Sequence, residues 1–253
     1  MIILLSPAKS LNFDPRADVP RTQPRLKKDV LELADVMKTK RAKDLRALMK
    51  ISQKLADLNE GRFKNFSASH TKDNSKQAMF AFTGDVYQGL EADTFTEKQI
   101  DYAQEHVRML SGLYGLLRPL DIMQPYRLEM GTKLKTGRGE NLYEFWGSKI
   151  AKLINKDLKA TGSRAVINLA SNEYFKSVDQ GVLDADVYDI DFRELRDGKF
   201  KFISFSAKKA RGYMTQYIVK KKLKDPQKIK AFDMEGYMFN ESLSEERRWV
   251  FTR

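Results

Sequence analysis

Short apolar runs along the chain mark the strands that we expect it to form. They cover residues 1–5, 78–82, 165–169, 186–195, 199–205 and 249–252. The first run ends at Ser6 because Pro7 cannot donate to a central ladder. The runs at 186–195 and 199–205 alternate apolar and polar residues around Asp197-Gly198. This dipeptide favours a tight turn, so the two runs predict a β-hairpin.

Longer stretches with apolar residues three and four positions apart predict helices. They cover residues 26–64, 97–110, 142–159 and 207–223. Thr96 is a suitable N-cap for the second stretch, and Ser52 is expected to divide the first into two helices. Gly212 lies inside the last stretch, where glycine costs about 1 kcal/mol relative to alanine unless another segment packs closely against it.

The last of these helices is expected to have one buried and one basic face. Its apolar stripe consists of Ala207, Ala210, Met214, Tyr217 and Ile218. Its outer arc carries Lys208, Lys209, Arg211 and Lys220. Lys208, Lys209 and Arg211 open the predicted helix, where cations oppose the helix dipole and an anionic ligand would relieve the conflict. Lys220, Lys221, Lys222 and the lysines up to Lys230 also fit a simple solvated basic face.

The positive charge of the chain is concentrated in one segment. The sequence has 46 Lys and Arg residues and 34 Asp and Glu residues, for a formal net charge of +12. Residues 199–230 contain eleven basic residues and one acidic residue, so this segment carries +10 of the total. Such a concentration favours a polyanionic partner, most often nucleic acid. An acidic membrane surface is the rival, but no lysine-rich segment joins a strongly apolar, Trp-bearing helix face.

Composition argues against several other kinds of site. The chain has no cysteine, which excludes disulfides, thiol chemistry and thiolate zinc sites. Its two histidines, His70 and His106, poorly supply a two-His metal site or a His-centred triad. Asp189 and Asp191 share one face of a predicted strand and could bind a metal, although a solvated face is the preferred interpretation. We therefore expect no metal and no cofactor.

Length and hydropathy favour a soluble, cytoplasmic protein. The 253 residues suffice for one large domain or two small ones with a sizeable core. The opening segment is too short and lacks the basic residues of a signal peptide. No run approaches the roughly 20 apolar residues of a membrane span, so no membrane partner is expected.

Three segments share a pattern that suggests a ligand site. LLSPAKS, NLASNEYFK and SFSAKKARG each leave an expected strand through Ser and Ala into Lys or Asn. Turns at strand ends collect ligands in α/β sheets, because free N–H groups and short polar side chains converge there. If the turns share one sheet edge, a cationic cleft would be lined by Lys9, Asn172, Lys176, Lys208 and Arg211. The alternative is that Ser and Asn simply cap the helices that follow.

Two further features carry both a structural and a functional interpretation. Arg118 and Arg127 each lie beside a proline-fixed turn, where they could hold a phosphate or carboxylate or belong to a tightly packed connection. The stretch LRALMKISQKLADLN resembles a helix–hairpin–helix, which grips DNA phosphates through backbone N–H groups. Its hairpin would consist of Lys50, Ile51, Ser52, Gln53 and Lys54. The usual Gly-x-Gly is missing, and an ordinary helical pair is the favoured interpretation.

Five motifs make the chain resemble the YaaA family of peroxide stress resistance proteins. They are SPAKSL, GDVYQGL, RMLSGLYGLLRPLDIMQPYRLEMG, NLASNEYFKSV and ISFSAKKARG. The resemblance implies a single α/β domain over residues 1–253, with a mixed sheet surrounded by helices and unlike the common superfolds. It also implies a helix–hairpin–helix-like element, which falls within a helical insertion at about 26–66, and a basic cleft on Lys208, Lys209 and Arg211 with their neighbours.

The resemblance further implies a cytoplasmic bacterial protein that limits free intracellular iron and oxidative damage and binds double-stranded or distorted DNA. The lysine-rich composition agrees with binding mainly to phosphates, independently of sequence. The alternative hypothesis is an enzyme that acts on nucleotides or damaged nucleic acid through the Lys/Ser/Asn-lined cleft. No P-loop, nucleophile elbow or metal-spaced motif is present, so no catalytic residue is assigned and enzyme activity stays open. Direct iron sequestration is disfavoured by the shortage of ligands.

Overall fold

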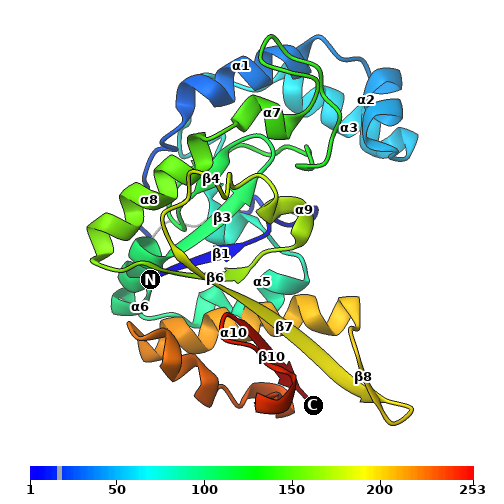
Figure 1. Cartoon of the computed structure of the whole chain (residues 1–253). Helices are drawn as coiled ribbons and strands as arrows, with labels where there is room; N and C mark the ends of the chain where they lie inside the picture. The colour runs from blue at the N-terminus through cyan, green and yellow to red at the C-terminus, as the bar shows by residue number, and fades with distance from the viewer. Residues whose placement is uncertain (16–18) are drawn as a thin grey trace.

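The computed structural model describes residues 1–15 and 19–253 and is built around one mixed sheet (Figure 1). Eight strands follow the order β4-β3-β1-β6-β7-β10-β9, with β8 paired to β7 outside this path. The strands are β1 (Ile2–Leu5), β3 (Val107–Ser111), β4 (Gly115–Leu117), β6 (Ala165–Leu169), β7 (Asp186–Arg196), β8 (Lys199–Lys201), β9 (Met238–Phe239) and β10 (Arg248–Thr252). The five from β3 to β10 are mutually parallel, and β4, β8 and β9 are antiparallel additions. A separate two-stranded sheet pairs β2 (Lys76–Gln77) with β5 (Ile122–Met123).

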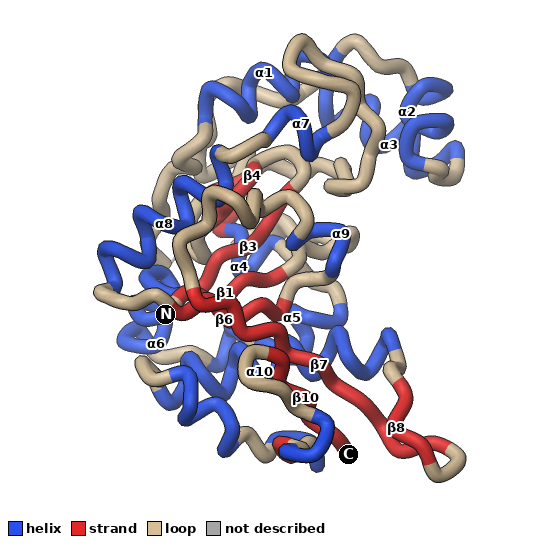
Figure 2. The backbone as a smooth tube through the Cα atoms, viewed as in Figure 1, coloured by secondary structure: helices blue, strands red, loops and turns tan. Residues whose placement is uncertain are grey.

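Helices surround this sheet, which confirms the expected α/β class (Figure 2). The α-helices are α1 (Lys27–Lys38), α2 (Ala42–Met49), α3 (Gln53–Lys64), α4 (Ala78–Ala81), α5 (Asp85–Leu90), α6 (Glu97–His106), α7 (Leu142–Trp146), α8 (Lys149–Thr161), α9 (Asn172–Phe175) and α10 (Ser204–Lys221). Short 3₁₀ turns lie at η1 (Ala92–Thr94), η2 (Pro226–Ala231), η3 (Met234–Gly236) and η4 (Glu241–Leu243).

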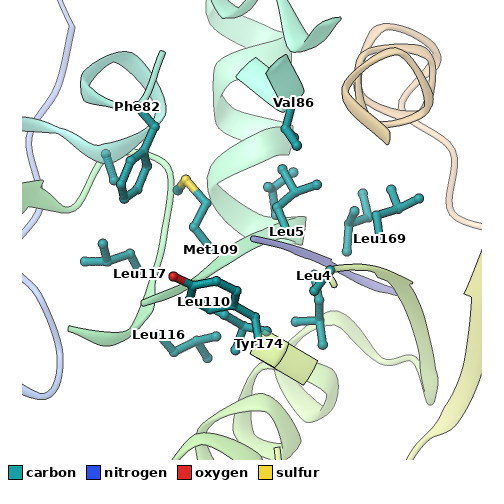
Figure 3. Close-up of a cluster of buried hydrophobic side chains, with 14 of the residues drawn as sticks. Leu4, Leu5, Phe82, Val86, Met109, Leu110, Leu116, Leu117, Leu169 and Tyr174 are labelled. Carbon is teal, nitrogen blue, oxygen red and sulfur yellow. The ribbon is translucent and has the colours of Figure 1, made fainter. Parts of the chain in front are cut away.

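Both faces of the central strands are buried. Leu5, Met109 and Leu169 lie on one face beneath Val86 of α5, while Leu4 and Leu110 point to the opposite face, toward Tyr174 of α9 (Figure 3). Strands covered on both faces are almost wholly apolar, as parallel sheets require. This explains why 1–5 and 165–169 could be recognised as strands from their apolar runs alone.

Helices α1, α2 and α3 fill residues 27–64 and lie at one end of the molecule (Figure 1). The break at Ser52 is confirmed, since its side chain accepts a hydrogen bond from Leu55 N at 3.4 Å. A second break after Lys38 makes three helices where two were predicted. The hydrophobic core is continuous from α1 into the sheet, through buried residues such as Leu33 and Ile3. The division into one domain with an insertion at 26–66 stays a prediction.

The prediction of one helix over 97–110 is wrong for its last four residues. Helix α6 ends at His106, and the chain continues directly into the central strand β3. Arg108, the second residue of that strand, folds its guanidinium back and donates to the carbonyl oxygens of Gln104 and Glu105 at 2.9 and 3.0 Å. These are carbonyls that a helix end leaves without partners, so Arg108 stabilises the termination of α6.

Two other boundaries differ from prediction. Residues 78–82 form the short helix α4 and its end rather than a strand, because a fully buried apolar run has no periodicity that separates the two. The stretch 142–159 is divided at Gly147, whose φ of 46° and ψ of −127° lie outside the helical region. The predicted hairpin turn is confirmed: Asp197 and Gly198 have φ of 52° and 71°, as a two-residue type I′ turn requires. The predicted second strand over 199–205 is too long, because β8 ends at Lys201 and α10 begins at Ser204.

Helix α10 crosses α5 at a contact between two glycines. A Cβ placed on Gly212 would lie 2.0 Å from the carbonyl oxygen of Val86, and one on Gly89 would lie 2.3 Å from the carbonyl oxygen of Lys209. The two backbones therefore touch directly, and no side chain fits between them. This close packing accounts for a glycine inside a long helix.

No helix in the described part of the chain combines the length and the apolar character needed to cross a bilayer.

Replacing Gly212 with alanine is expected to lower the free energy of unfolding by about 2 kcal/mol or more, because the new methyl group overlaps backbone atoms that cannot move aside independently. Gly61→Ala in α3 is the matched control, since a Cβ there meets no described atom within 4 Å outside its own helix. The control should be neutral or gain up to about 1 kcal/mol from helix propensity. Urea denaturation measures both, and equal stability of the two variants would contradict the proposed helix contact.

Candidate functional site

The carboxyl ends of β1 and β6 meet at one edge of the sheet, because the two strands are parallel neighbours. The turns that follow them are joined directly. Ser171 N donates to Ser6 Oγ at 2.9 Å, and Ser6 Oγ donates to Ser171 Oγ at 3.3 Å. Tyr87 of α5 donates its hydroxyl proton to the carbonyl oxygen of Ser6 at 2.9 Å. Two of the three predicted turns therefore share one edge.

The third segment reaches the same edge from a helix rather than from a strand end. Helix α10 begins at Ser204, not at Ala207, so Lys208 and Arg211 lie one and two turns inside it. The interpretation that they sit at the positive end of the helix dipole is therefore wrong, since that effect is confined to the first turn. They face the β1 and β6 turns because α10 packs against α5.

These segments enclose a hollow of about 430 Å³, called here the carboxyl-edge pocket. It is lined by Ser6, Lys9, Asp85, Tyr87, Glu129, Ser171, Glu173, Tyr174, Lys208 and Arg211, with further residues of the 6–10 and 84–87 segments. Three of these side chains are cationic and three are carboxylates. The pocket is therefore mixed in charge rather than uniformly basic.

The carboxylate of Glu129 forms ion pairs with two of the predicted cations. Lys9 Nζ lies 3.0 Å from Glu129 Oε1, and Arg127 Nη2 lies 2.9 Å from the same oxygen. Glu173 is engaged by the backbone, because its Oε1 accepts a hydrogen bond from Gly131 N at 2.9 Å. Lys9 and Arg127 thus share one carboxylate, and each is a poorer candidate for an external anion than a cation without a partner.

Arg211 is in the opposite situation. Its guanidinium is partly buried in the pocket wall, and no hydrogen bond or ion pair joins it to any described residue. Its Nε is fully buried without a partner. Burial lowers the pKa of this guanidinium, which the more distant charge of Asp191 opposes only in part. A buried cation without a counter-ion is costly, so an anion in the pocket would stabilise it.

The two tyrosines of the pocket act as hydrogen-bond donors rather than bases. Burial raises the pKa of Tyr87 and of Tyr174 well above the ordinary value, so both hydroxyls stay protonated at neutral pH. Lys208 is exposed at the mouth of the pocket and has no ion-pair partner among the described residues. The groups available to an incoming anion are therefore Lys208 and Arg211.

Other predicted residues lie outside the pocket lining. Asn172 begins α9 and is exposed, while its neighbours Ser171 and Glu173 line the hollow instead. Lys176 Nζ lies 5.2 Å from the ring centroid of Tyr143. Lys209 Nζ lies 5.5 Å from the ring centroid of Tyr213.

Arg118 and the rear lysines are remote from this pocket. Arg118 pairs with the buried Asp121 at 2.8 Å and lines a different hollow, at the amino ends of the strands. Lys220, Lys221 and Lys222 are exposed at the far end of α10, about 18 Å from Lys208 at 1.5 Å per residue. Arg118 is thus ion-paired within the fold, and its role in anion binding stays a prediction. The lysine-rich segment is divided between two edges of the sheet.

The helix pair α2 and α3 presents its connecting turn to solvent. Lys50 adopts a left-handed conformation with φ of 52°, and Ile51 is buried beneath the turn. Lys50, Gln53 and Lys54 are exposed. The structure thus contains the predicted helical pair, whereas its role as a helix–hairpin–helix element stays a prediction.

Sequence reasoning missed the acidic and aromatic members of the pocket. Asp85 and Tyr87 lie in GDVYQGL, Glu129 in RLEMG and Tyr174 in NLASNEYFKSV. All of them fall inside the segments that carry the family resemblance, which was the available signal. Among the residues described, no group of three or more Asp, Glu or His side chains is arranged to hold a metal ion.

Replacing Arg211 with methionine is expected to leave the free energy of unfolding unchanged, or to raise it by about 1 kcal/mol, because a lone buried charge does not stabilise a fold. Arg108→Met is the comparison, since Arg108 is buried and pairs with Asp157 at 2.6 Å. Its loss should cost about 3 kcal/mol. Chemical denaturation measures both variants. A decrease of more than about 2 kcal/mol in Arg211→Met would mean that Arg211 is a structural residue.

Comparison with known proteins identifies the family. The model of the family described as peroxide stress protein YaaA matches residues 1–243. The chain is 51% identical over 254 aligned positions to a UPF0246 protein of Saccharophagus degradans, covering 100% of this chain and 99% of that protein. It is 52% identical to a UPF0246 protein of Polaromonas sp. and 50% identical to one of Aliivibrio fischeri, each over 100% of this chain and 98% of the relative. The matches span every segment that forms the carboxyl-edge pocket, and the chain belongs to the peroxide stress protein YaaA family.

Proposed function

We propose that this chain is a DNA-binding protein of the cellular response to hydrogen peroxide, and that it binds duplex or distorted DNA mainly through phosphate contacts at the mouth of the carboxyl-edge pocket. Membership of the peroxide stress protein family supports the process. The net charge of +12 supports a polyanionic partner. We further propose that it acts in the cytoplasm and limits free iron and oxidative damage there.

The observation that carries the proposal is the unpaired state of Arg211 and Lys208. The nearby cations Lys9 and Arg127 are both engaged by Glu129. Arg211 is held in the pocket wall without a counter-ion among the described residues, and Lys208 lies beside it at the mouth. A DNA phosphate would supply the missing negative charge to both side chains.

The exposed turn between α2 and α3 supports a second phosphate contact. Lys50, Gln53 and Lys54 present donors to solvent there, and Ser52 caps the helix that follows. In a helix–hairpin–helix the backbone N–H groups at such a turn bind phosphate. The Gly-x-Gly that allows the closest backbone approach is absent, so on this proposal the lysines contribute most of the contact.

The effect on iron would be indirect. The described residues offer no cluster of three carboxylate or histidine ligands. On this proposal the chain limits free iron without storing the metal itself, and by occupying DNA it also protects DNA from iron-driven damage.

A second candidate is an enzyme acting on a nucleotide or on damaged nucleic acid. The enclosed form and mixed charge of the pocket favour it, since 430 Å³ lies within the range of small-molecule sites. Asp85 and Glu173 supply carboxylates, Tyr174 supplies a neutral donor, and Lys208 supplies an amine.

Charge reversal at the front of α10 is expected to weaken DNA binding selectively. Lys208→Glu with Lys209→Glu should lower affinity for a duplex at least tenfold and reduce the salt slope of log K by roughly 2, which is about 0.9 for each phosphate that the variant no longer neutralises. The matched control is Lys152→Glu with Lys156→Glu on α8, where both lysines are exposed and the charge change is identical.

Fluorescence anisotropy at several salt concentrations separates the outcomes. The control should weaken binding less than about threefold, because those charges act only from a distance through a screening solution. Equal weakening by the α10 and α8 double variants would show that net charge alone determines affinity. Unchanged affinity in the α10 variant would contradict the proposed contact.

The enzyme candidate predicts a covalent intermediate on DNA that contains an abasic site. Borohydride should trap an imine between the aldehyde and a lysine amine, and Lys208→Ala should abolish the adduct. Absence of both adduct and strand cleavage with the wild-type protein would count against this candidate while leaving DNA binding intact.

A further inference from the structure

The β7–β8 hairpin carries an unusual density of exposed apolar side chains. Leu195, Phe200, Phe202 and Phe205 are 54%, 38%, 54% and 63% exposed. They account for four of the six large hydrophobic residues that are exposed in the described chain, and they fall within eleven consecutive positions. Scattered single exposures are ordinary, whereas a cluster marks an interaction surface.

This hairpin extends away from the body of the molecule (Figures 1 and 2). Leu195 pairs directly with Phe200, so their side chains share one face of the ribbon. Arg196 pairs with Lys199, and Glu194 pairs with Lys201, on the opposite face. The hairpin therefore has one apolar, aromatic face and one charged face, on which Arg196 is paired with Glu194 and Lys201 with Asp197.

The base of the hairpin is firmly anchored. Glu194 is buried, and Arg196 and Arg253 each lie 2.7 Å from one of its carboxylate oxygens. A hydrogen bond from Ser206 lowers the pKa of Glu194 to about 2, together with the two arginines and against the effect of burial. Glu194 thereby joins β7 to the first turn of α10 and to the chain end, which holds the exposed ribbon in a defined position.

The charge around this ribbon identifies the kind of partner. Residues 196–211 contain six basic residues and one acidic residue. A second copy of the chain would bring two such basic surfaces together, which electrostatic repulsion opposes. A partner must instead offer flat apolar surfaces alongside negative charge. Unpaired nucleobases attached to a phosphate backbone have both properties.

The ribbon is also continuous with the carboxyl-edge pocket. Phe205 lies in the first turn of α10, and Lys208 and Arg211 follow one and two turns later. Residues three or four positions apart on a helix are neighbours on its surface. A DNA strand bound to Lys208 and Arg211 would therefore reach the aromatic face of the hairpin next.

From this geometry we infer that Phe200, Phe202 and Phe205 stack on unpaired bases of DNA while Lys208 and Arg211 contact the adjoining phosphates, so that the β7–β8 hairpin selects bubbles and single strands over intact duplex. This inference rests on the proposed DNA binding and assigns to the hairpin the part of recognition that distinguishes distorted DNA.

The test compares the double variant Phe200→Ala/Phe202→Ala with the wild-type protein. Three probes are used: a duplex, the same duplex with a central bubble of unpaired thymines, and an oligothymidine. Stacking on each base is worth about tenfold or more in affinity. The variant should bind the bubble and the oligothymidine at least tenfold more weakly and the duplex less than twofold more weakly. Leu58→Ala with Met238→Ala is the matched control, because both residues are exposed apolar side chains elsewhere.

A direct stacking signal comes from Phe202→Trp. The native Trp146 and Trp249 are buried, so the new indole is the one exposed to DNA. Oligothymidine should quench its fluorescence, which a merely structural role for Phe202 would not produce. Absence of quenching at saturating oligothymidine would overturn the inference.

The remaining outcomes separate the hairpin from the proposed function. Equal affinities for duplex and bubble, with the double variant unaffected, would overturn the inference and leave duplex binding standing. Equal weakening on duplex and bubble would also overturn it. Failure of the wild-type protein to bind any probe would overturn the proposed function itself. Phe-dependent sedimentation with anionic phosphatidylserine vesicles, or Phe-dependent dimerisation, would assign the ribbon to a membrane or a second copy instead.

Discussion

The direct contact between the backbones of α5 and α10 determines where this protein presents its positive charge. Gly89 and Gly212 permit that contact, because a Cβ on either one would overlap the opposing backbone. Arg211 immediately precedes Gly212 and Lys208 lies one turn earlier, so the crossing fixes both cations next to Asp85 and Tyr87 at the start of α5. Without it, the basic face of α10 would have no fixed relation to the turns after β1 and β6.

The pairing of charges then separates structural cations from available ones. Arg108 is buried against Asp157 and the end of α6, Arg118 is paired with Asp121, and Glu129 engages both Lys9 and Arg127. Arg211 differs from these four cations, because its guanidinium has no ion-pair or hydrogen-bond partner in the described chain and is partly removed from water by burial. Ion pairs of the first kind stabilise the fold, whereas a buried cation left without a counter-ion costs stability and is ready to bind an anion. Whether a cation is structural or available depends on the carboxylates that lie beside it, which a count of basic residues does not reveal.

Much of the fold could be predicted because its signals are local. The run 165–169 is apolar throughout because both faces of the sheet are covered, and Asp197-Gly198 marks the hairpin by its turn chemistry. The errors arose where tertiary contacts overrode local pattern. Arg108 ends α6 through hydrogen bonds that sequence spacing does not reveal, and residues 78–82 are buried on all sides in a helical turn. The pocket was predicted through its cations, while its carboxylates were missed because a single sequence does not show that Glu129 comes from a distant loop to meet Lys9.

The central claim is that DNA binds at the front of α10 rather than over the whole basic surface. Its most direct measurement is acetylation of the lysines in the wild-type protein with and without duplex DNA, quantified by mass spectrometry. The account predicts that DNA protects Lys208 and Lys209, while Lys152 and Lys156 on α8 keep their reactivity and Lys220, Lys221 and Lys222 are protected less. Uniform protection of all these lysines, or protection confined to Lys220–Lys222, would contradict it.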